Sequence, residues 1–289
     1  MEPIAVMVNG IPGRIASQVA LRLAADPRFR LVPYALTGPD IAAAEQPIGA
    51  VRVRLVRPEA REAAIAEIRA AWPEVLCVDY THPAAVVPNA AFYCRHGLPF
   101  VMGTTGGDRR ALEALVAASP VAAVVAPNMA RPIVGFQAMM EAAAERFPGL
   151  FRGFRLTIEE SHQQGKADTS GTARALVAVF NRLGVPFREE EIRRVRDPEE
   201  QRNRLGVPEA YLGGHAWHTY RLVSEDETVC FEFTHRVNGR DVYVQGTLDA
   251  LVFLRDRLRE GACGRIFSMI DVLEGKPLKK SPPAAENTP

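Results

Sequence analysis

The fold of the first half is decided by the segment Ile4-Ala5-Val6-Met7-Val8-Asn9-Gly10-Ile11-Pro12-Gly13-Arg14-Ile15-Ala16. An apolar run at 4–9 predicts a buried strand, and an amphipathic helical pattern follows at 13–25. Glycines at such a turn let the backbone approach a pyrophosphate, which the N–H groups and dipole of the helix start then hold. The segment therefore favours a dinucleotide site, although a tight turn that merely opens a helix shows the same pattern.

The same alternation continues along the first half of the chain. Strands are expected at 31–36, 51–55, 75–80, 99–102 and 121–126, with helices at 58–71, 83–95 and 108–118. Alternating strands and helices require right-handed crossovers and a parallel sheet that is covered on both faces. We therefore expect an α/β fold, in which residues 1–129 form a doubly wound, Rossmann-like dinucleotide-binding domain.

Near residue 130 the pattern changes to longer strands. A helix at 132–147, a strand at 153–160 and a helix at 171–184 are expected, and Asn238-Gly239 favours a type I′ hairpin between strands at 229–237 and 241–246. These features predict a second, α+β domain at 130–246 with a mixed or antiparallel sheet. Segment 247–275, with helices at 247–259 and 265–274, is expected to return to the first domain, and the composition of 276–289 predicts a disordered tail.

Composition and charge limit the classes of partner. The 289 residues are 47% hydrophobic and 24% charged, with a net charge of +1, so we expect neither nucleic acid nor an anionic membrane as a partner. The N-terminus has no leader pattern and no apolar run approaches about 18 residues, which predicts a soluble protein that is not exported. Cys77, Cys94, Cys230 and Cys263 are widely spaced, as expected of reduced thiols in the cytoplasm.

The polar run at 159–172 holds the strongest candidates for chemistry. Only four of the 35 basic residues are lysines, and the other three lie in the tail, so Lys166 favours a site that needs a compact charge on a flexible stem. His162 can transfer a proton near neutral pH. Ser170, Gly171 and Thr172 open a helix whose free N–H groups can bind an anion, with Asp168 and Thr169 as expected caps. Together they suit a carboxylate-bearing substrate; a solvated loop before a capped helix is the alternative.

Cofactor preference depends on the residues at the end of the second strand. The acid that binds the ribose hydroxyl of NAD is expected there, but Thr37-Gly38 occupy the position and Asp40 comes late. Arg14 is instead able to face a 2′-phosphate, so NADPH is slightly favoured over NADH.

Two more polar loops begin where strands end, at 103–107 and 127–129. Ligands of open α/β sheets bind beyond the carboxyl ends of the strands, so both loops are expected to share one edge with the Gly10 turn. Their small residues leave room for a planar ring. As an alternative, both loops are connectors and Asp108 only caps a helix.

Other polar residues have simpler explanations. His215 and His218 resemble a metal pair, but residues three apart on a strand point to opposite faces, so no metal site is expected. His235 shares a face with Phe231 and Phe233, which favours a core or interface histidine. Arg240 follows the Asn-Gly pair; it is either a surface residue or a carboxylate ligand.

Several of these motifs also resemble those of a known family. They are Asn-Gly-x-x-Gly-Arg at 9–14, Val-Asp-Tyr-Thr-His-Pro at 78–83, Gly-Thr-Thr-Gly at 103–106, Ala-Pro-Asn-Met at 126–129 and Glu-Ser-His-x-x-x-Lys-x-Asp-x-Ser-Gly-Thr-Ala at 160–173. The pattern is similar to 4-hydroxy-tetrahydrodipicolinate reductase, formerly dihydrodipicolinate reductase, across nearly the whole chain. It is closest to the plant-type branch: Gln163 replaces a second histidine found in many bacterial members, Thr169 stands alone where they have Ala-Pro, and Ala16 replaces a glycine.

The resemblance implies specific roles. Gly10, Gly13, Arg14 and Ile15 would hold NADPH or NADH, and Gly103, Thr105, Ala126 and Met129 would line the nicotinamide. His162 matches the proton donor and Lys166 the second catalytic residue. Thr104, Ser170, Gly171 and Thr172 would contact a small dicarboxylate substrate.

The resemblance also implies an NAD(P)H-dependent oxidoreductase of lysine and diaminopimelate biosynthesis that forms a homo-oligomer, either a dimer or a tetramer. Two other functions remain open from the residues alone. One is a different two-domain dehydrogenase, acting on an amino acid, a sugar or a semialdehyde. The other is a nucleotide-sensing regulator without turnover, for which the polar run from His162 to Lys166 would have no purpose.

Overall fold

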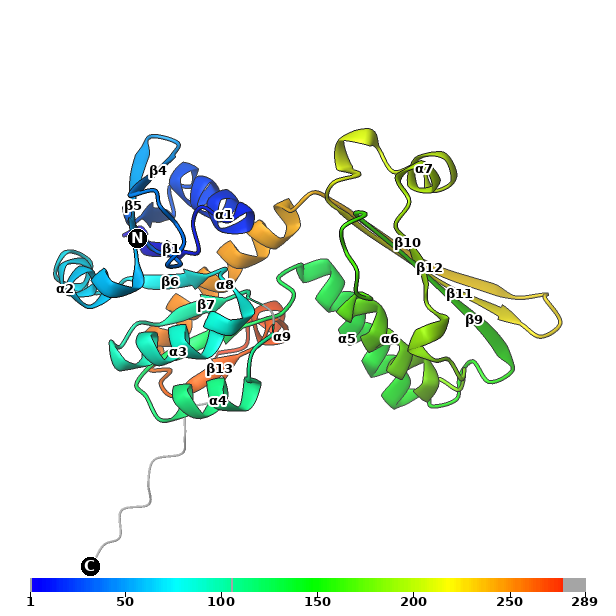
Figure 1. Ribbon diagram of the computed structural model, residues 1–289. Coiled ribbons are helices and arrows are strands. Elements are labelled where there is room, and N and C mark those ends of the chain that lie inside the picture. The colour runs from blue at the N-terminus through cyan, green and yellow to red at the C-terminus, as the bar shows by residue number, and fades with distance from the viewer. Residues whose placement is uncertain (1, 105, 278–289) are drawn as a thin grey trace, which may run out of the picture. The chain divides into compact units, whose positions relative to one another are not determined.

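The computed structural model describes residues 2–104 and 106–277. Within them the chain divides into two compact units (Figure 1). The first joins the N-terminal part, through Met129, to the segment that begins at Val244, and the second runs from Ala130 to Tyr243. Most of the expected tail, 278–289, lies outside the described residues.

The first unit is built on a six-stranded parallel sheet in the order β13-β8-β7-β6-β1-β2. The strands are β1 (Ile4–Asn9), β2 (Phe29–Leu31), β6 (Leu76–Asp79), β7 (Phe100–Met102), β8 (Ala122–Val125) and β13 (Arg265–Phe267). Because β2 and β6 flank β1 on opposite sides, the order of the strands reverses at β1. A doubly wound sheet binds its ligand at such a reversal, beyond the carboxyl ends of the strands.

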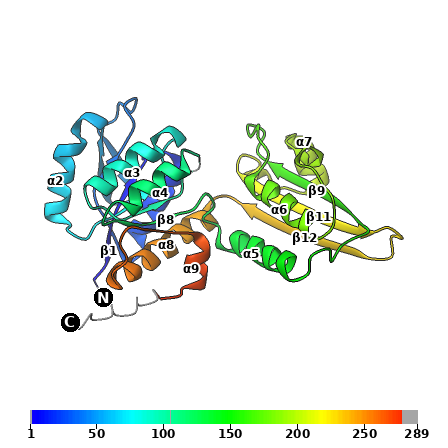
Figure 2. The same ribbon diagram turned by 90° about the horizontal axis from the view of Figure 1, so that it is seen from below.

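Helices cover both faces of this sheet. They are α1 (Arg14–Ala25), α2 (Arg61–Ala71), α3 (Val86–Arg95), α4 (Arg109–Ala117), α8 (Asp241–Arg259) and α9 (Met269–Glu274), with short 3-10 turns at Pro58–Ala60 and Pro83–Ala85. Figure 2 shows α3 and α4 on one face and α8 and α9 on the other. The Rossmann-like α/β fold predicted from the alternating pattern is therefore confirmed.

The expected strand at 31–36 is divided between two sheets. Pro33, which has no N–H for a sheet ladder, separates β2 from β3 (Tyr34–Leu36). β3 belongs to a separate three-stranded sheet with β5 (Val51–Val56) and β4 (Glu45–Ile48). The strand expected at 51–55 therefore exists, but it lies outside the main parallel sheet.

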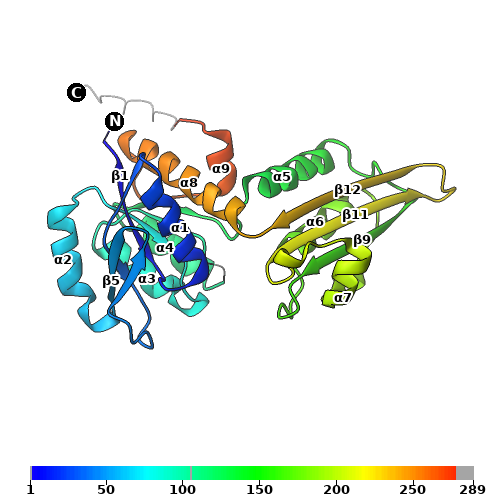
Figure 3. The ribbon, with the colours of Figure 1, turned by 90° about the horizontal axis from the view of Figure 1, so that it is seen from above.

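The second unit contains a mixed sheet in the order β10-β9-β11-β12. Its strands are β9 (Phe154–His162), β10 (Arg193–Val195), β11 (His215–Ser224) and β12 (Cys230–Asn238). Strands β9, β11 and β12 run side by side in Figures 1 and 3. Helices α5 (Arg131–Arg146) and α6 (Gly171–Arg182) cover one face and share a core with Ile158, Tyr220 and Leu222. The predicted mixed sheet is confirmed. Short turns at Glu189–Glu191, Pro198–Glu200 (α7), Gln201–Leu205 and Glu209–Tyr211 complete the unit.

Two predictions near the C-terminus are wrong. Asn238-Gly239 does not form a hairpin: β12 pairs antiparallel with β11, and Gly239, at φ +73°, donates its N–H to the Gly214 carbonyl before α8 begins at Asp241. An acid at a helix start is favourable, so Asp241 suits its observed place. The helix expected at 265–274 begins only at Met269, because residues 265–267 pair with β8 and bury Phe267.

Candidate active site

The glycine turn after β1 is closely packed against the loop after β6. Gly10 has φ +96°, and a Cβ at this position would lie 2.0 Å from the Tyr80 carbonyl oxygen. A Cβ on Gly13 would lie 2.8 Å from the Gly10 carbonyl oxygen. Both glycines are therefore needed for the backbone path itself, whatever they bind.

The start of α1 fits an anionic ligand. Gly13 is the N-cap, so no side chain caps this helix, and its first turn carries no acid. Arg14 is exposed there and Ile15 is partly buried. Thr37 closes the turn by donating its hydroxyl to the Ile11 carbonyl at 2.9 Å. Uncapped N–H groups beside an arginine are the donor set that a pyrophosphate requires, so these residues fit a dinucleotide.

Tyr80 connects the turns that the sequence had singled out separately. A Cβ on Gly103 would lie 2.3 Å from the Tyr80 ring, so this glycine makes room for the aromatic side chain. The Tyr80 hydroxyl lies 2.6 Å from Thr247 Oγ1 in α8, and burial raises the pKa of Tyr80 to about 12. No role was predicted for Tyr80 from the sequence, although Gly10 and Gly103, which both pack against it, belong to motifs that were recognised there.

A fully buried carboxylate lies at the end of β6. Asp79 Oδ2 accepts hydrogen bonds from Tyr93 (2.8 Å) and Asn89 (2.9 Å), and Oδ1 accepts from the hydroxyls of Thr81 (2.7 Å) and Thr104 (2.8 Å). Four donors satisfy the carboxylate without a cation. The network fixes the loop that begins at Gly103 against the neighbouring strand.

The residues expected to line the nicotinamide are only partly open to a ligand. Thr104 uses its hydroxyl within the Asp79 network, where it also accepts from the Thr81 N–H at 2.8 Å. Ala126 and Met129 are 2% exposed. Gly246 in α8 lies so close that a Cβ on it would be 1.8 Å from the Met129 carbonyl oxygen. Thr105 lies outside the described residues.

In the second unit, the helix-covered face of the sheet changes from apolar to polar along its strands. Ile158, Tyr220 and Phe233 form one apolar row across β9, β11 and β12. The next row on this face contains Glu160, His218 and His235. His162 lies two residues beyond Glu160 along β9, on the same face, and pairs with Ala216. His162 and His218 are 7% and 2% exposed. The antiparallel register therefore gathers three imidazoles and a carboxylate at one end of the core.

Glu160 links this cluster to the start of α6. Its Oε2 accepts the Ser170 N–H at 2.9 Å, and its Oε1 pairs with Arg196 at 2.5 Å. Arg196, which follows β10, also donates to the Lys166 carbonyl at 2.8 Å and the Asp168 carbonyl at 3.2 Å. One buried ion pair thus fixes the loop that carries Lys166. Arg196 could not be predicted from the sequence, because it lies 36 residues from Glu160 and has no local signal.

Lys166 lies near His162 but has a competing partner. Its Nζ lies 2.7 Å from Asp168 Oδ1, and this pairing holds the pKa of Asp168 below its usual range. Asp168 is therefore an ion-pair partner, and the prediction that it caps α6 is wrong. Ser170 occupies the N-cap without a side-chain cap bond, so within the described ranges no side chain is seen to cap α6. The N–H groups of Gly171 and Thr172 are those that a substrate carboxylate would need.

His162 is held as a neutral imidazole. Burial lowers its pKa to about 3, and the positive charges of Arg196 and Lys166 act in the same direction. Its Nε2 lies 3.1 Å from His218 Nε2, and its carbonyl accepts from buried Gln201 at 2.6 Å. The electrostatics that disfavour the imidazolium are those that attract an anion, so a bound dicarboxylate would raise this pKa again.

Glu160, His162 and His218 could together hold a metal ion by the spacing of their ligand atoms. The carboxylate is already paired with Arg196, and Lys166 lies close by. A divalent cation would have to displace the guanidinium and approach an ammonium. The donor set therefore does not favour a metal.

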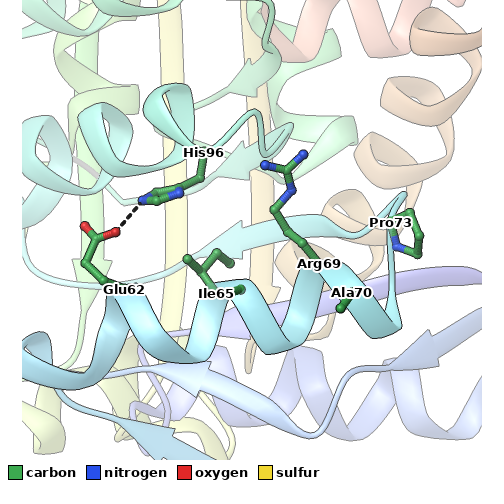
Figure 4. A pocket seen from close by; sticks show the side chains of 7 residues that line it. Glu62, Ile65, Arg69, Ala70, Pro73 and His96 are labelled. Carbon is green, nitrogen blue, oxygen red and sulfur yellow. Dashed lines mark ion pairs between the residues drawn. The ribbon is translucent and has the colours of Figure 1, made fainter.

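A pocket of about 400 Å³ lies elsewhere, on the first unit (Figure 4). It is lined by Glu62, Ile65, Ala66, Arg69, Ala70, Pro73 and His96, and Glu62 pairs with His96 at 2.9 Å. These residues belong to α2 and its C-terminal end and to the end of α3. None of them is a residue that the sequence predicts to act in the site.

Comparison with models of known families shows to which family the chain belongs. Residues 4–129 match the family model "Dihydrodipicolinate reductase, N-terminus", and residues 133–273 match "Dihydrodipicolinate reductase, C-terminus". The chain belongs to the dihydrodipicolinate reductase family. The resemblance inferred from the sequence motifs is thereby confirmed.

Relatives within the family include plant proteins. Probable 4-hydroxy-tetrahydrodipicolinate reductase 1 of rice, named as chloroplastic, is 44% identical over 93% of this chain and 78% of its own. 4-hydroxy-tetrahydrodipicolinate reductase 2 of Arabidopsis thaliana, also chloroplastic by name, is 42% identical over 93% of this chain and 77% of its own. The similarity to the plant-type branch is therefore confirmed as well.

A solved dihydrodipicolinate reductase from Paenisporosarcina sp. TG-14, bound to dipicolinate, shares the fold. Its TM-score is 0.64 at 19% identity, covering 92% of this chain and 97% of that one. No helix in the described part of the chain is both long and apolar enough to cross a membrane.

Proposed function

We propose that this member of the dihydrodipicolinate reductase family reduces 4-hydroxy-tetrahydrodipicolinate to tetrahydrodipicolinate with NADPH or NADH, as a step toward diaminopimelate and lysine. One observation carries the proposal. A chain that matches both family models over nearly its whole length also holds a buried His162, a nearby Lys166 and an α6 start without a visible side-chain cap in one loop. These groups suit a substrate with two carboxylates and a basic ring position.

Binding would begin with an exchange of ion-pair partners. Lys166 would leave Asp168, which is 72% exposed and readily hydrated, and pair with a substrate carboxylate. The N–H groups at the start of α6 would hold the same or the second carboxylate. Arg196 keeps this loop in place through its bonds to the Lys166 and Asp168 carbonyls.

Proton transfer would follow from the change in charge. The nicotinamide, when bound, would supply a hydride to C4 of the substrate ring. The negative charge that then develops on the substrate ring must be removed by a proton. Burial disfavours the imidazolium of His162 in the free protein, and the charges of Arg196 and Lys166 add to this effect. A dianionic substrate would offset the contribution of these two charges. The substrate would thus raise the pKa of His162 toward neutrality and load the acid that completes the reaction.

Cofactor binding is proposed for the glycine turn and the start of α1, through Gly10, Gly13, Arg14 and Ile15. Gly103, Thr105, Ala126 and Met129 are proposed to surround the nicotinamide, and Thr104 to face the substrate. The exposed arginine at the start of α1 and the absence of an acid directly after β3 favour NADPH. A cytoplasmic location and a homo-oligomer stay predictions.

Initial rates provide the test. The condensation product of pyruvate and aspartate semialdehyde should drive rapid oxidation of NADPH, and NADH should be compared at matched concentrations. Oxidation with an amino acid, a sugar or a semialdehyde instead would favour the alternative of another dehydrogenase. Tight NADPH binding without oxidation by any of these substrates would favour a nucleotide-sensing regulator.

A further inference from the structure

His218 and Tyr220 form a polar pair behind His162 that the proposed mechanism does not yet use. Both lie on the helix-covered face of β11, two residues apart, and are 2% and 0% exposed. His218 Nε2 lies 3.1 Å from His162 Nε2, and His218 Nδ1 lies 3.0 Å from the Tyr220 hydroxyl. A continuous line of hydrogen bonds therefore runs from the proposed proton donor into the core of the second unit.

The chemistry of these atoms allows two arrangements. When His162 is neutral at Nε2, His218 donates its Nε2–H to that nitrogen and its own Nδ1 accepts from the Tyr220 hydroxyl. When His162 carries a proton on Nε2, it donates to His218 Nε2, and His218 is then the tautomer with its proton on Nδ1, which donates to the Tyr220 oxygen. A hydroxyl can both donate and accept, so Tyr220 supports either tautomer of His218.

The surroundings make this support necessary. Arg196, from the segment after β10, and Lys166, from the loop before α6, place positive charge beside His162, and His215 of β11 adds a third basic group. Glu160 is already neutralised by Arg196, and the ring of His235 in β12 lies tilted against that of His218, with 4.6 Å between ring centroids. Among the described groups that face His162, only His218 offers its Nε2 a hydrogen-bonding partner.

We propose that His218, supported by Tyr220, is a positioning residue for His162: it accepts the Nε2–H of the protonated imidazole and returns a hydrogen bond when the imidazole is neutral. The inference rests on the proposed role of His162 as proton donor. It gives this chain a second imidazole for the acid, supplied by β11 instead of by the residue after His162, which is Gln163.

The pH dependence of kcat separates this role from simple packing. Activity should fall as pH rises through the pKa of His162 in the substrate complex, which forms the basic limb of the profile. Tyr220→Phe removes the oxygen that accepts from His218 when His162 is protonated. Because the hydrogen bond from a charged imidazole is stronger than that to a neutral one, the protonated state loses more support and the basic limb should move to lower pH. His218→Leu should move the basic limb further, by about one pH unit to lower pH. At a pH above the limb, kcat of this variant should then be about tenfold lower than that of the wild type.

Thr219→Val is the matched control. It removes a hydroxyl from the same strand, but on the opposite face, where Thr219 contacts Thr234 at 3.1 Å. This variant should keep the wild-type profile. A purely structural role for His218 and Tyr220 would lower the folded fraction, and with it the amplitude of the profile, while leaving the limb in place.

The ¹⁵N shifts of His162, measured with dipicolinate as the probe, give a second readout. The wild type should show more protonation at Nε2 than Tyr220→Phe at the same pH. The inference is overturned if Tyr220→Phe, the variant least expected to misfold, leaves both the basic limb and these shifts unchanged. An inactive wild type would instead count against the proposed function, so the two failures are distinguishable.

Discussion

Replacing Arg196 with methionine should destabilise the second unit strongly. Glu160 is fully buried, and its carboxylate is satisfied by Arg196 at 2.5 Å and the Ser170 N–H at 2.9 Å. Methionine retains the apolar stem but leaves the carboxylate with a single donor. Removing one partner of a buried ion pair costs about 3–5 kcal/mol, a large share of the roughly 5–15 kcal/mol that stabilises a typical domain.

Urea unfolding followed by tryptophan fluorescence measures this loss. The chain has two tryptophans, Trp72 in the first unit and Trp217 in the second, so a Trp72→Phe background reports on the second unit alone. Trp217 is 8% exposed and donates to Asn238, and its emission should change sharply on unfolding.

The double variant Glu160→Gln/Arg196→Met is the control, because it removes both charges and keeps the size of the side chains. It should recover most of the lost stability. A loss below about 1 kcal/mol in Arg196→Met, or a double variant as unstable as the single one, would refute the reasoning that this pair is a buried, mutually dependent unit.

Three further predictions concern the cofactor turn, the lysine and the histidines. Gly10→Ala places a Cβ 2.0 Å from the Tyr80 carbonyl oxygen, so NADPH affinity in a fluorescence titration should fall by more than about tenfold. Gly97→Ala is the control: Gly97 also has a positive φ, +62°, but no atom lies within 4 Å of the added Cβ, so this variant should bind NADPH normally. Asp168→Asn frees Lys166 from its 2.7 Å partner, so the KM for the dicarboxylate should decrease at constant ionic strength; an increased KM would show that Asp168 positions the lysine. The pKa of His162 is lowered to about 3, so the folded state keeps it neutral while the unfolded chain protonates near pH 6.5, and stability is lost as pH falls between these values. At pH 5 this amounts to about 2 kcal/mol less than at pH 7.5, and urea unfolding of His162→Gln should lose that part of the pH dependence.

Local periodicity predicted most of the elements because their apolar faces follow one regular period. The strand at 4–9 and the helix expected at 171–184 are examples, with α6 ending at Arg182. The hairpin at Asn238-Gly239 failed because a two-residue turn signal is weak against tertiary pairing: nine residues of β12 pair along β11 and leave Gly239 at the strand end. β13 has only three residues, which is too short for a period to distinguish a strand from a helix.

The residues of the candidate site likewise fall into those that the sequence predicts and those that it does not. His162, Lys166 and the start of α6 share one loop, so their spacing was visible in the sequence. The roles of Arg196 and His218 were not visible. Arg196 lies 36 residues from Glu160 and His218 lies 56 residues from His162, and each reaches the site only through the pairing of β10 and β11 with β9. His218 was considered only as half of a metal pair with His215. The two do lie on opposite faces, but the strand register pairs His218 with Glu160, diagonally across from His162, and the Nε2 atoms of the two histidines lie 3.1 Å apart.

The central claim is that Lys166 acts on the substrate and His162 delivers the proton, while the first unit holds the cofactor. It is tested most directly by measuring kcat and the Kd for NADPH on the same preparation of Lys166→Ala. We expect kcat to fall by about 100-fold or more, while the Kd for NADPH changes less than about threefold. Unchanged turnover with the pyruvate-derived dicarboxylate would contradict the account.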